Sequence, residues 1–135
     1  MRLNDGIIIP NKGKNSPELG PVAVVSGTQT DLFLLCELFD INVDDYQNLF
    51  TSRLYVPCRS IGAASLCGPL VGAPYAVMVI ENLIAWGAQT LFFVGWCGSI
   101  SQQVKIGDIV MATSAFIDEG TSRHYEHNEN GRSYP

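Results

Sequence analysis

Two short, uninterrupted apolar runs, each followed by a glycine, constrain the fold of this chain most strongly. They are VAVVS at Val22–Ser26 and TLFFV at Thr90–Val94, followed by Gly27 and Gly95. A continuous apolar run of this length is typical of a strand that is covered on both faces of its sheet. We therefore expect two buried strands, each ending in a glycine turn.

Helical patterns follow the first run and precede the second. A helix is expected after the turn at Gly27, with Thr30 as its N-cap residue. Its buried stripe consists of Leu32, Leu35, Cys36 and Phe39. A second helix is expected to carry Pro74 in its first turn and to end at Gly87. Its apolar face consists of Ala76, Val77, Ile80, Leu83 and Ile84.

Further strands are expected in two other parts of the chain. Two short strands should lie within residues 53–67, around Pro57 and Arg59, and another should cover Asp108–Ile117. Strands then alternate with helices along the chain. This alternation predicts an α/β fold, with a mainly parallel or mixed, twisted sheet flanked by helices.

The composition supports one folded domain over residues 1–135. Apolar residues make up 47% and charged residues 16% of the chain, which excludes a disordered segment. A loop rich in proline and glycine at residues 10–21 leads into the first strand.

The net charge of -5, with scattered basic residues, argues against nucleic-acid binding. No apolar window reaches the roughly 18 residues of a membrane helix. Four cysteines without a CxxC pair indicate reduced thiols in a cytoplasmic protein.

Glycine-bearing turns indicate where a ligand would bind. In a sheet of this kind the ligand crevice lies beyond the carboxyl ends of the strands. The turns at Gly27–Thr28 and Gly95–Gly98, and the loop at residues 68–74, occupy such places. Glycine lets the backbone approach a ligand and offers its N–H groups. The alternative is that these glycines only satisfy turn geometry.

Three segments of the chain carry a resemblance to a known family: VAVVSGTQTD (residues 22–31), GPLVGAPYAVMVIENLIAWGAQTLFFVGWCGSI (68–100) and VKIGDIVMATSAFIDEGTSRHY (104–125). In their order and spacing they resemble the N-terminal part of the nucleoside phosphorylase superfamily. The DEGTSRHY segment is most similar to the uridine phosphorylase-like branch. The resemblance implies a phosphorylase-like fold, a nucleoside or nucleobase as ligand, and phosphorolysis of the N-glycosidic bond. Phosphate would be the co-substrate, and no cofactor or metal is implied.

The resemblance also implies an incomplete site. Family enzymes continue beyond the position of Pro135, so a truncated member is expected. The family site is completed by a neighbouring subunit, which implies a homo-oligomer. Two other functions stay open: a non-catalytic module for binding or assembly, and a phosphate-independent nucleosidase.

The resemblance assigns site residues to the glycine turns. Substrate binding falls on Gly27, Thr28, Gly95, Trp96, Cys97 and Gly98. Phosphate would meet the backbone of Gly27 and a cross-subunit arginine, either Arg53 or Arg59. The alternative for both arginines is a solvated charge on a strand edge.

Three positions depart from the family pattern of phosphate ligands. Asp31, Phe93 and Trp96 stand where the family carries a basic residue, an arginine, and a serine or threonine. Asp31 is a candidate catalytic base in a nucleosidase, or else only a favourable charge in the first turn of a helix. The aromatic residues could stack on a ligand, fill space or contact a subunit. His124 and His127 are expected in an exposed loop and not at a metal.

Overall fold

The computed structural model describes residues 10–57, 64–125 and 132–133, and the chain divides into two units. The larger unit extends to Trp96, and the smaller one begins at Cys97. The larger unit contains a five-stranded sheet in the order β2-β3-β4-β1-β5. The strands are β1 Val22–Ser26, β2 Gln47–Leu49, β3 Ser52–Tyr55, β4 Ser65–Gly68 and β5 Thr90–Val94.

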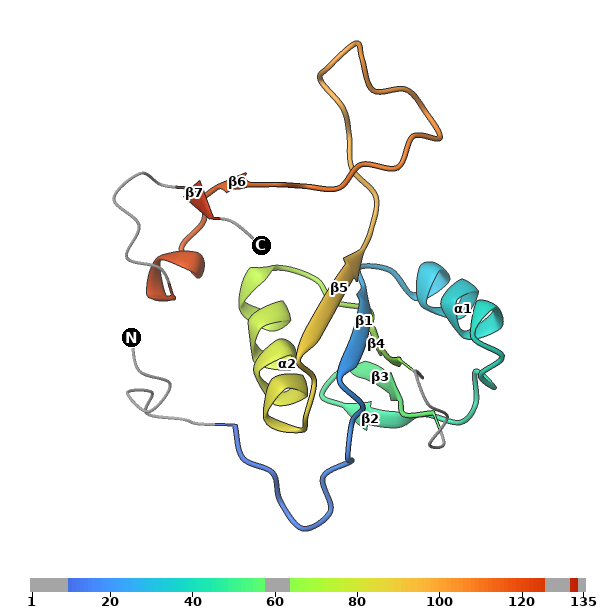
Figure 1. Cartoon of the computed structure of the whole chain (residues 1–135). Coiled ribbons are helices and arrows are strands. Elements are labelled where there is room, and N and C mark those ends of the chain that lie inside the picture. The colour runs from blue at the N-terminus through green and yellow to red at the C-terminus, as the bar shows by residue number, and fades with distance from the viewer. Residues whose placement is uncertain (1–9, 58–63, 126–131, 134–135) are drawn as a thin grey trace. The chain divides into compact units, whose positions relative to one another are not determined.

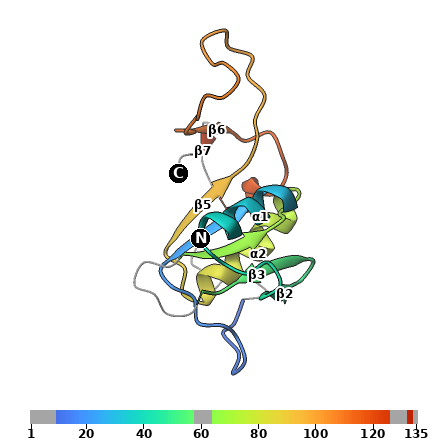
Figure 2. The same cartoon turned by 90° about the vertical axis from the view of Figure 1, so that its right-hand side faces the viewer.

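The sheet is mixed, in agreement with the fold class expected from the sequence. β1 runs parallel to both of its neighbours, β4 and β5, whereas β3 is antiparallel to β2 and β4. Figure 2 shows the β2–β3 hairpin at the side of the sheet away from β5. The hairpin strand β2 was not predicted. Arg53 lies on β3, inside the sheet, so the expectation that it occupies a strand edge was wrong.

The two helices, α1 (Gln29–Leu38) and α2 (Ala73–Ala85), cover opposite faces of the sheet (Figure 1). Successive strand residues point to opposite faces. Accordingly Ala23 and Val25 belong to the core cluster of α2, whereas Val24 belongs to the core cluster of α1. The expected bounds and burial of β1 are thus confirmed.

The cap of α1 differs from the prediction. Thr28, not Thr30, is the N-cap residue, because its backbone is extended and its Oγ1 accepts a hydrogen bond from the backbone N–H of Asp31 at 3.1 Å. Thr30 is already inside the helix. Leu32 and Cys36 form the buried stripe as expected, but Phe39 is exposed at the C-cap.

Helix α2 buries part of the predicted face, since Leu83 is fully buried and Ala76 packs against the core as expected. Pro74 lies in its first turn as expected, and Gly87 follows its C-cap with φ of 125°. The fully buried residues are Val79 and Leu83, whereas Ile84 is exposed. Contact with the sheet decides which apolar positions of the helix are buried.

Strand β5 has the predicted bounds but not the predicted burial. Four of its five residues are exposed, including Phe92, Phe93 and Val94. β5 is the last strand in the sheet order, and its pairing partner is β1. Its apolar side chains therefore reflect strand propensity and not coverage by the described residues.

The smaller unit has little regular structure in its described residues. It contains β6 (Ala115–Phe116) and β7 (Arg132–Ser133), which form an antiparallel pair, and a 3-10 turn at Ser122–His124. The strand expected over Asp108–Ile117 was wrong except at Ala115–Phe116. A strand needs a pairing partner, and the described part of this unit offers one only to these two residues.

A carboxylate caps the 3-10 turn of the smaller unit. Glu119 accepts hydrogen bonds of 2.7 Å from the backbone N–H groups of Thr121 and Ser122. Hydrogen bonds from Ser122 are the main reason that the pKa of Glu119 is lowered to about 2.

In the described residues, neither α1 nor α2 has the length and apolar character to cross a membrane.

Candidate functional site

The turn after β1 is held by its own side chains. Ser26 Oγ donates a hydrogen bond of 2.7 Å to the carbonyl of Thr28 and accepts one of 3.2 Å from the Thr28 backbone N–H. The N–H of Gly27 donates to the carbonyl of Val94 at 3.3 Å. This bond joins the carboxyl ends of β1 and β5. The two glycine turns predicted from the sequence thus lie side by side at one edge of the sheet.

Asp31 lies at the centre of this site and is 9% exposed. Its Oδ2 accepts a hydrogen bond of 2.6 Å from the Thr28 hydroxyl. The indole Nε1 of Trp96 lies 2.9 Å from Oδ2 and 3.1 Å from Oδ1, so it donates to the same carboxylate. Residues 65 positions apart in the chain therefore share one hydrogen-bond network.

Aromatic rings form the open side of the site. The side chain of Trp96 is 85% exposed and that of Phe93 is 60% exposed, although Trp96 is held at one end by Asp31. A Cβ built on Gly95 would lie 3.0 Å from Cε1 of Phe93, so the glycine makes room for that ring. An exposed, anchored indole beside a phenyl ring offers a flat apolar surface for a planar ligand.

Cations are scarce around the site. In residues 10–57 and 64–96 the basic side chains are Lys12, Lys14 and Arg53. Lys12 pairs with Glu18 at 3.7 Å, and Lys14 lies in the loop before β1. The described groups that donate hydrogen bonds to the Asp31 carboxylate are the Thr28 hydroxyl and the Trp96 indole N–H, and both are uncharged.

Arg53 is engaged away from the turn. Its guanidinium lies 4.3 Å from the ring centroid of Tyr46 and 5.2 Å from that of Phe33. A hydrogen bond with Tyr55 is the largest of the effects that raise the pKa of Arg53 above its ordinary value. Arg59, the other candidate phosphate ligand, lies outside the described residues.

The remaining predicted site residues fall in the smaller unit. Cys97 and Gly98 are both exposed there.

Cys36 and Cys67 are buried free thiols, and Cys97 is an exposed one. His124 lies in the 3-10 turn, and His127 lies outside the described residues. The described part of the chain contains no group of three or more potential metal ligands.

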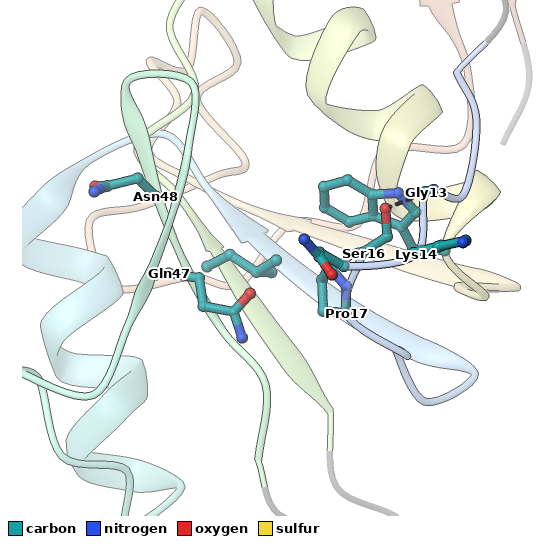
Figure 3. A pocket seen from close by; sticks show the side chains of 9 residues that line it. Gly13, Lys14, Ser16, Pro17, Gln47 and Asn48 are labelled. Atoms are coloured by element: carbon teal, nitrogen blue, oxygen red, sulfur yellow. Dashed lines mark hydrogen bonds between the residues drawn. The ribbon is translucent and has the colours of Figure 1, made fainter.

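A separate pocket opens at the other end of the strands (Figure 3). It has a volume of about 430 Å³ and is lined by loop residues 13–17, by Gln47 and Asn48 of β2, and by Leu54 and Trp86. Trp86 accepts a backbone bond from Leu19, which places this pocket near the start of β1. It includes no residue that the sequence assigned to the site.

Ser26 is the site residue that sequence reasoning missed. Ser26 is fully buried. Its hydroxyl donates to the carbonyl of Thr28, and its own carbonyl accepts a hydrogen bond of 2.8 Å from the N–H of Leu70, so both groups organise the turn. The available signal was its position as the only polar residue of the VAVVS run, directly before the glycine.

Comparison with known proteins identifies relatives of this chain. The family model described as "Phosphorylase superfamily" matches residues 21–135. A guanosine phosphorylase from Halorubrum lacusprofundi is 37% identical over 46% of this chain and 26% of its own length. A uridine phosphorylase from Thermococcus kodakarensis is 42% identical over 41% of this chain and 20% of its own.

A third match is longer. A DeoD-type purine nucleoside phosphorylase from Clostridium novyi is 27% identical over 82% of this chain and 48% of its own length. The chain thus spans about half, or less, of the length of these curated relatives. No solved structure matches the chain.

Proposed function

Because the chain belongs to the phosphorylase superfamily, we propose that it binds a nucleoside or nucleobase at the carboxyl ends of β1 and β5 and takes part in cleavage of the N-glycosidic bond. The names of the relatives support this substrate class, since they are guanosine, uridine and purine nucleoside phosphorylases. The exposed rings of Phe93 and Trp96 offer a stacking surface for the base.

The proposal extends to the setting of the reaction. The protein works in the cytoplasm as a homo-oligomer, and phosphorolysis with phosphate as co-substrate would require a cation from Arg53 or Arg59 of a neighbouring copy. The buried, free thiols of Cys36 and Cys67 suit a reducing compartment. The exposed apolar side chains of β5 suit an assembly that covers them.

A second candidate, hydrolysis in place of phosphorolysis, is favoured by the Asp31 network. A carboxylate and a phosphate anion about 4 Å apart repel each other by ~4 kcal/mol at an effective dielectric constant of ~20. The donors around Asp31 are directed at its own carboxylate and not at an incoming anion. Asp31 would then accept a proton from water as the water oxygen bonds to C1 of the sugar, while the C1–N bond breaks and the departing base takes up a proton from solvent.

Incubation with a panel of purine and pyrimidine nucleosides, with and without phosphate, tests both candidates. We expect release of free base that does not depend on phosphate, and no saturable binding of millimolar phosphate by calorimetry. Base release that rises with phosphate and yields ribose 1-phosphate would establish phosphorolysis instead. Absence of base release, with nucleoside binding retained, would indicate a non-catalytic binding module.

A matched pair of variants assigns the role of Asp31. Asp31→Asn keeps a hydrogen-bond acceptor for Trp96 but removes the base, so we expect base release to fall at least 100-fold, within the usual range for loss of general base catalysis. Asp40→Asn removes the same charge beyond the C-terminal end of α1 and should leave base release unchanged. Equal activity of the two variants would exclude Asp31 as the base.

A further inference from the structure

The candidate site joins a negative charge to an exposed aromatic ring. The Asp31 carboxylate accepts hydrogen bonds from the Thr28 hydroxyl and from the indole N–H of Trp96. Both donors are uncharged, so they orient the carboxylate without cancelling its charge. The Trp96 side chain stays 85% exposed although its N–H is held by Asp31. A ligand that stacks on this ring therefore lies next to a negative charge.

The ring of Phe93 borders the same turns. A Cβ on Gly27 would lie 3.5 Å from Cζ of Phe93, and a Cβ on Gly95 would lie 3.0 Å from its Cε1. The faces of aromatic rings carry negative potential, and they attract a cation within about 6 Å of the ring centroid, tryptophan most strongly. A hydrogen bond from the indole N–H to a carboxylate polarises the ring and strengthens this attraction.

The charge of Asp31 has no ionic partner among residues 10–57 and 64–96. Of the basic side chains there, Lys12 pairs with Glu18, and the Arg53 guanidinium lies over two aromatic rings away from the turn. The net charge of the whole chain, -5, has the same sign as the site. A site of this sign attracts cations and repels anions.

We propose that this site takes N-glycosides whose planar base carries a positive charge, such as purine nucleosides alkylated at N7. The inference rests on the proposed nucleoside site and names its substrate class. The base would stack on Trp96 and place its charge over the ring and close to the Asp31 carboxylate. A neutral base would gain the stacking alone.

A charged base also removes the need for an acid in the site. The water oxygen bonds to C1 of the sugar and its proton passes to Asp31, while the C1–N bond breaks. The electron pair of that bond stays on the base nitrogen, so a cationic base departs neutral and takes up no proton. The hydroxyl and indole donors at Asp31 are weak acids, and this leaving group requires no stronger one.

Calorimetric titration of two ligands of the same shape tests the preference for positive charge. The 7,9-dimethylguaninium cation carries a methyl group in place of ribose, so it has no glycosidic bond to break. Its neutral isostere, 7-deaza-7,9-dimethylguanine, has carbon in place of N7. In mildly acidic buffer, where the cation keeps its full charge, we expect it to bind the wild type at least tenfold more tightly than the isostere.

Three variants assign the preference to particular side chains. Asp31→Asn keeps an acceptor for Trp96 but removes the charge, so the preference should fall to about threefold or less. Asp40→Asn removes a charge beyond the C-terminal end of α1 and should keep the full preference. Trp96→Leu removes the stacking surface at an exposed position and should weaken binding of both ligands at least tenfold. Circular dichroism would verify that each variant is folded.

Cleavage of 7-methylguanosine without phosphate tests whether a bound cation is a substrate. We expect the wild type and Asp40→Asn to release 7-methylguanine faster than buffer alone does. Asp31→Asn should lose at least 100-fold of this enzyme-dependent rate, within the usual range for loss of a general base.

The outcomes separate this inference from the proposed function beneath it. Equal binding of the cation and the neutral isostere would overturn the inference and leave the nucleoside site intact. Absence of binding of both ligands and of the nucleoside panel would overturn the nucleoside site as well. A preference that persists in Asp31→Asn would overturn the selection of positive charge by Asp31. A cation that binds but is released from its nucleoside no faster than in buffer would overturn the substrate class.

Discussion

At Gly68 the absence of a side chain allows two parallel strands to lie next to each other. A Cβ at this position would lie 2.8 Å from the carbonyl oxygen of Ser26, closer than such atoms approach in proteins. That carbonyl accepts the N–H of Leu70 and belongs to the turn that carries Thr28. Packing at one residue of β4 therefore determines the geometry of the candidate site on β1.

Substitution of Gly68 by alanine should destabilise the larger unit. The backbone oxygen of Ser26 cannot rotate away as a side chain would, so we expect a loss of about 2 kcal/mol, within the usual cost of overpacking. Gly13→Ala is the control, because its Cβ would make only an ordinary contact of 3.7 Å with Ser16. Urea denaturation measures both variants, and equal stability of the two would contradict the steric argument.

At the scale of elements, the start of α1 connects the fold with the candidate site. The Thr28 side chain accepts the Asp31 backbone N–H and donates to the Asp31 carboxylate. The cap therefore satisfies a free N–H group of the first turn and also orients the carboxylate. The same carboxylate holds Trp96 after β5, so helix α1 and strand β5 meet through one side chain.

The identity of the cap can be tested by two threonine substitutions. Thr28→Ala removes the N-cap acceptor and should cost about 1 kcal/mol of the unfolding free energy. Thr30→Ala should cost nothing, because Thr30 is an exposed residue inside the helix, where alanine has the higher helix propensity. Thermal and urea unfolding would compare the two. A larger loss for Thr30→Ala would restore the cap expected from the sequence alone.

At the scale of the whole molecule, stability resides in the sheet and its two helices. The core clusters lie on the two faces of the sheet, one under α1 and one under α2. Cys67 on β4 is fully buried in the cluster under α2, and this burial raises the pKa of its thiol to about 12. A buried thiol of this kind couples the stability of the larger unit to alkaline pH.

The free energy of unfolding should fall as pH rises through the interval between the two pKa values of Cys67. The unfolded thiol loses its proton above pH 9, whereas the native thiol keeps it up to about pH 12. The native state then binds more protons, so stability falls by up to about 1.4 kcal/mol per pH unit.

Denaturation of the wild type and of Cys67→Ala at several pH values across this interval measures the effect. Burial also raises the pKa of Tyr55, but Tyr55 is present in both proteins, so its contribution cancels in the comparison. We expect the wild type to lose stability more steeply with pH than Cys67→Ala. Parallel pH profiles would show that Cys67 does not contribute to the alkaline transition.

Local patterns in the sequence predicted two strands, the two ends of one helix and the family. The apolar runs predicted β1 and β5 with their observed bounds, and Pro74 and Gly87 predicted the two ends of α2. The resemblance of three segments, residues 22–31, 68–100 and 104–125, pointed to the superfamily that the family model matches. These features depend on backbone conformation and on neighbours in the chain, and local residue types are sufficient to encode them.

The burial of β5 and the contacts between distant groups depended on the tertiary structure. It left β5 exposed where the sequence predicted a covered strand, and it allowed pairing only for Ala115–Phe116 in the region of the last expected strand. It also placed the indole of Trp96 on the carboxylate of Asp31, 65 residues away. Burial and long-range hydrogen bonds depend on which elements come together, and no local pattern carries that information.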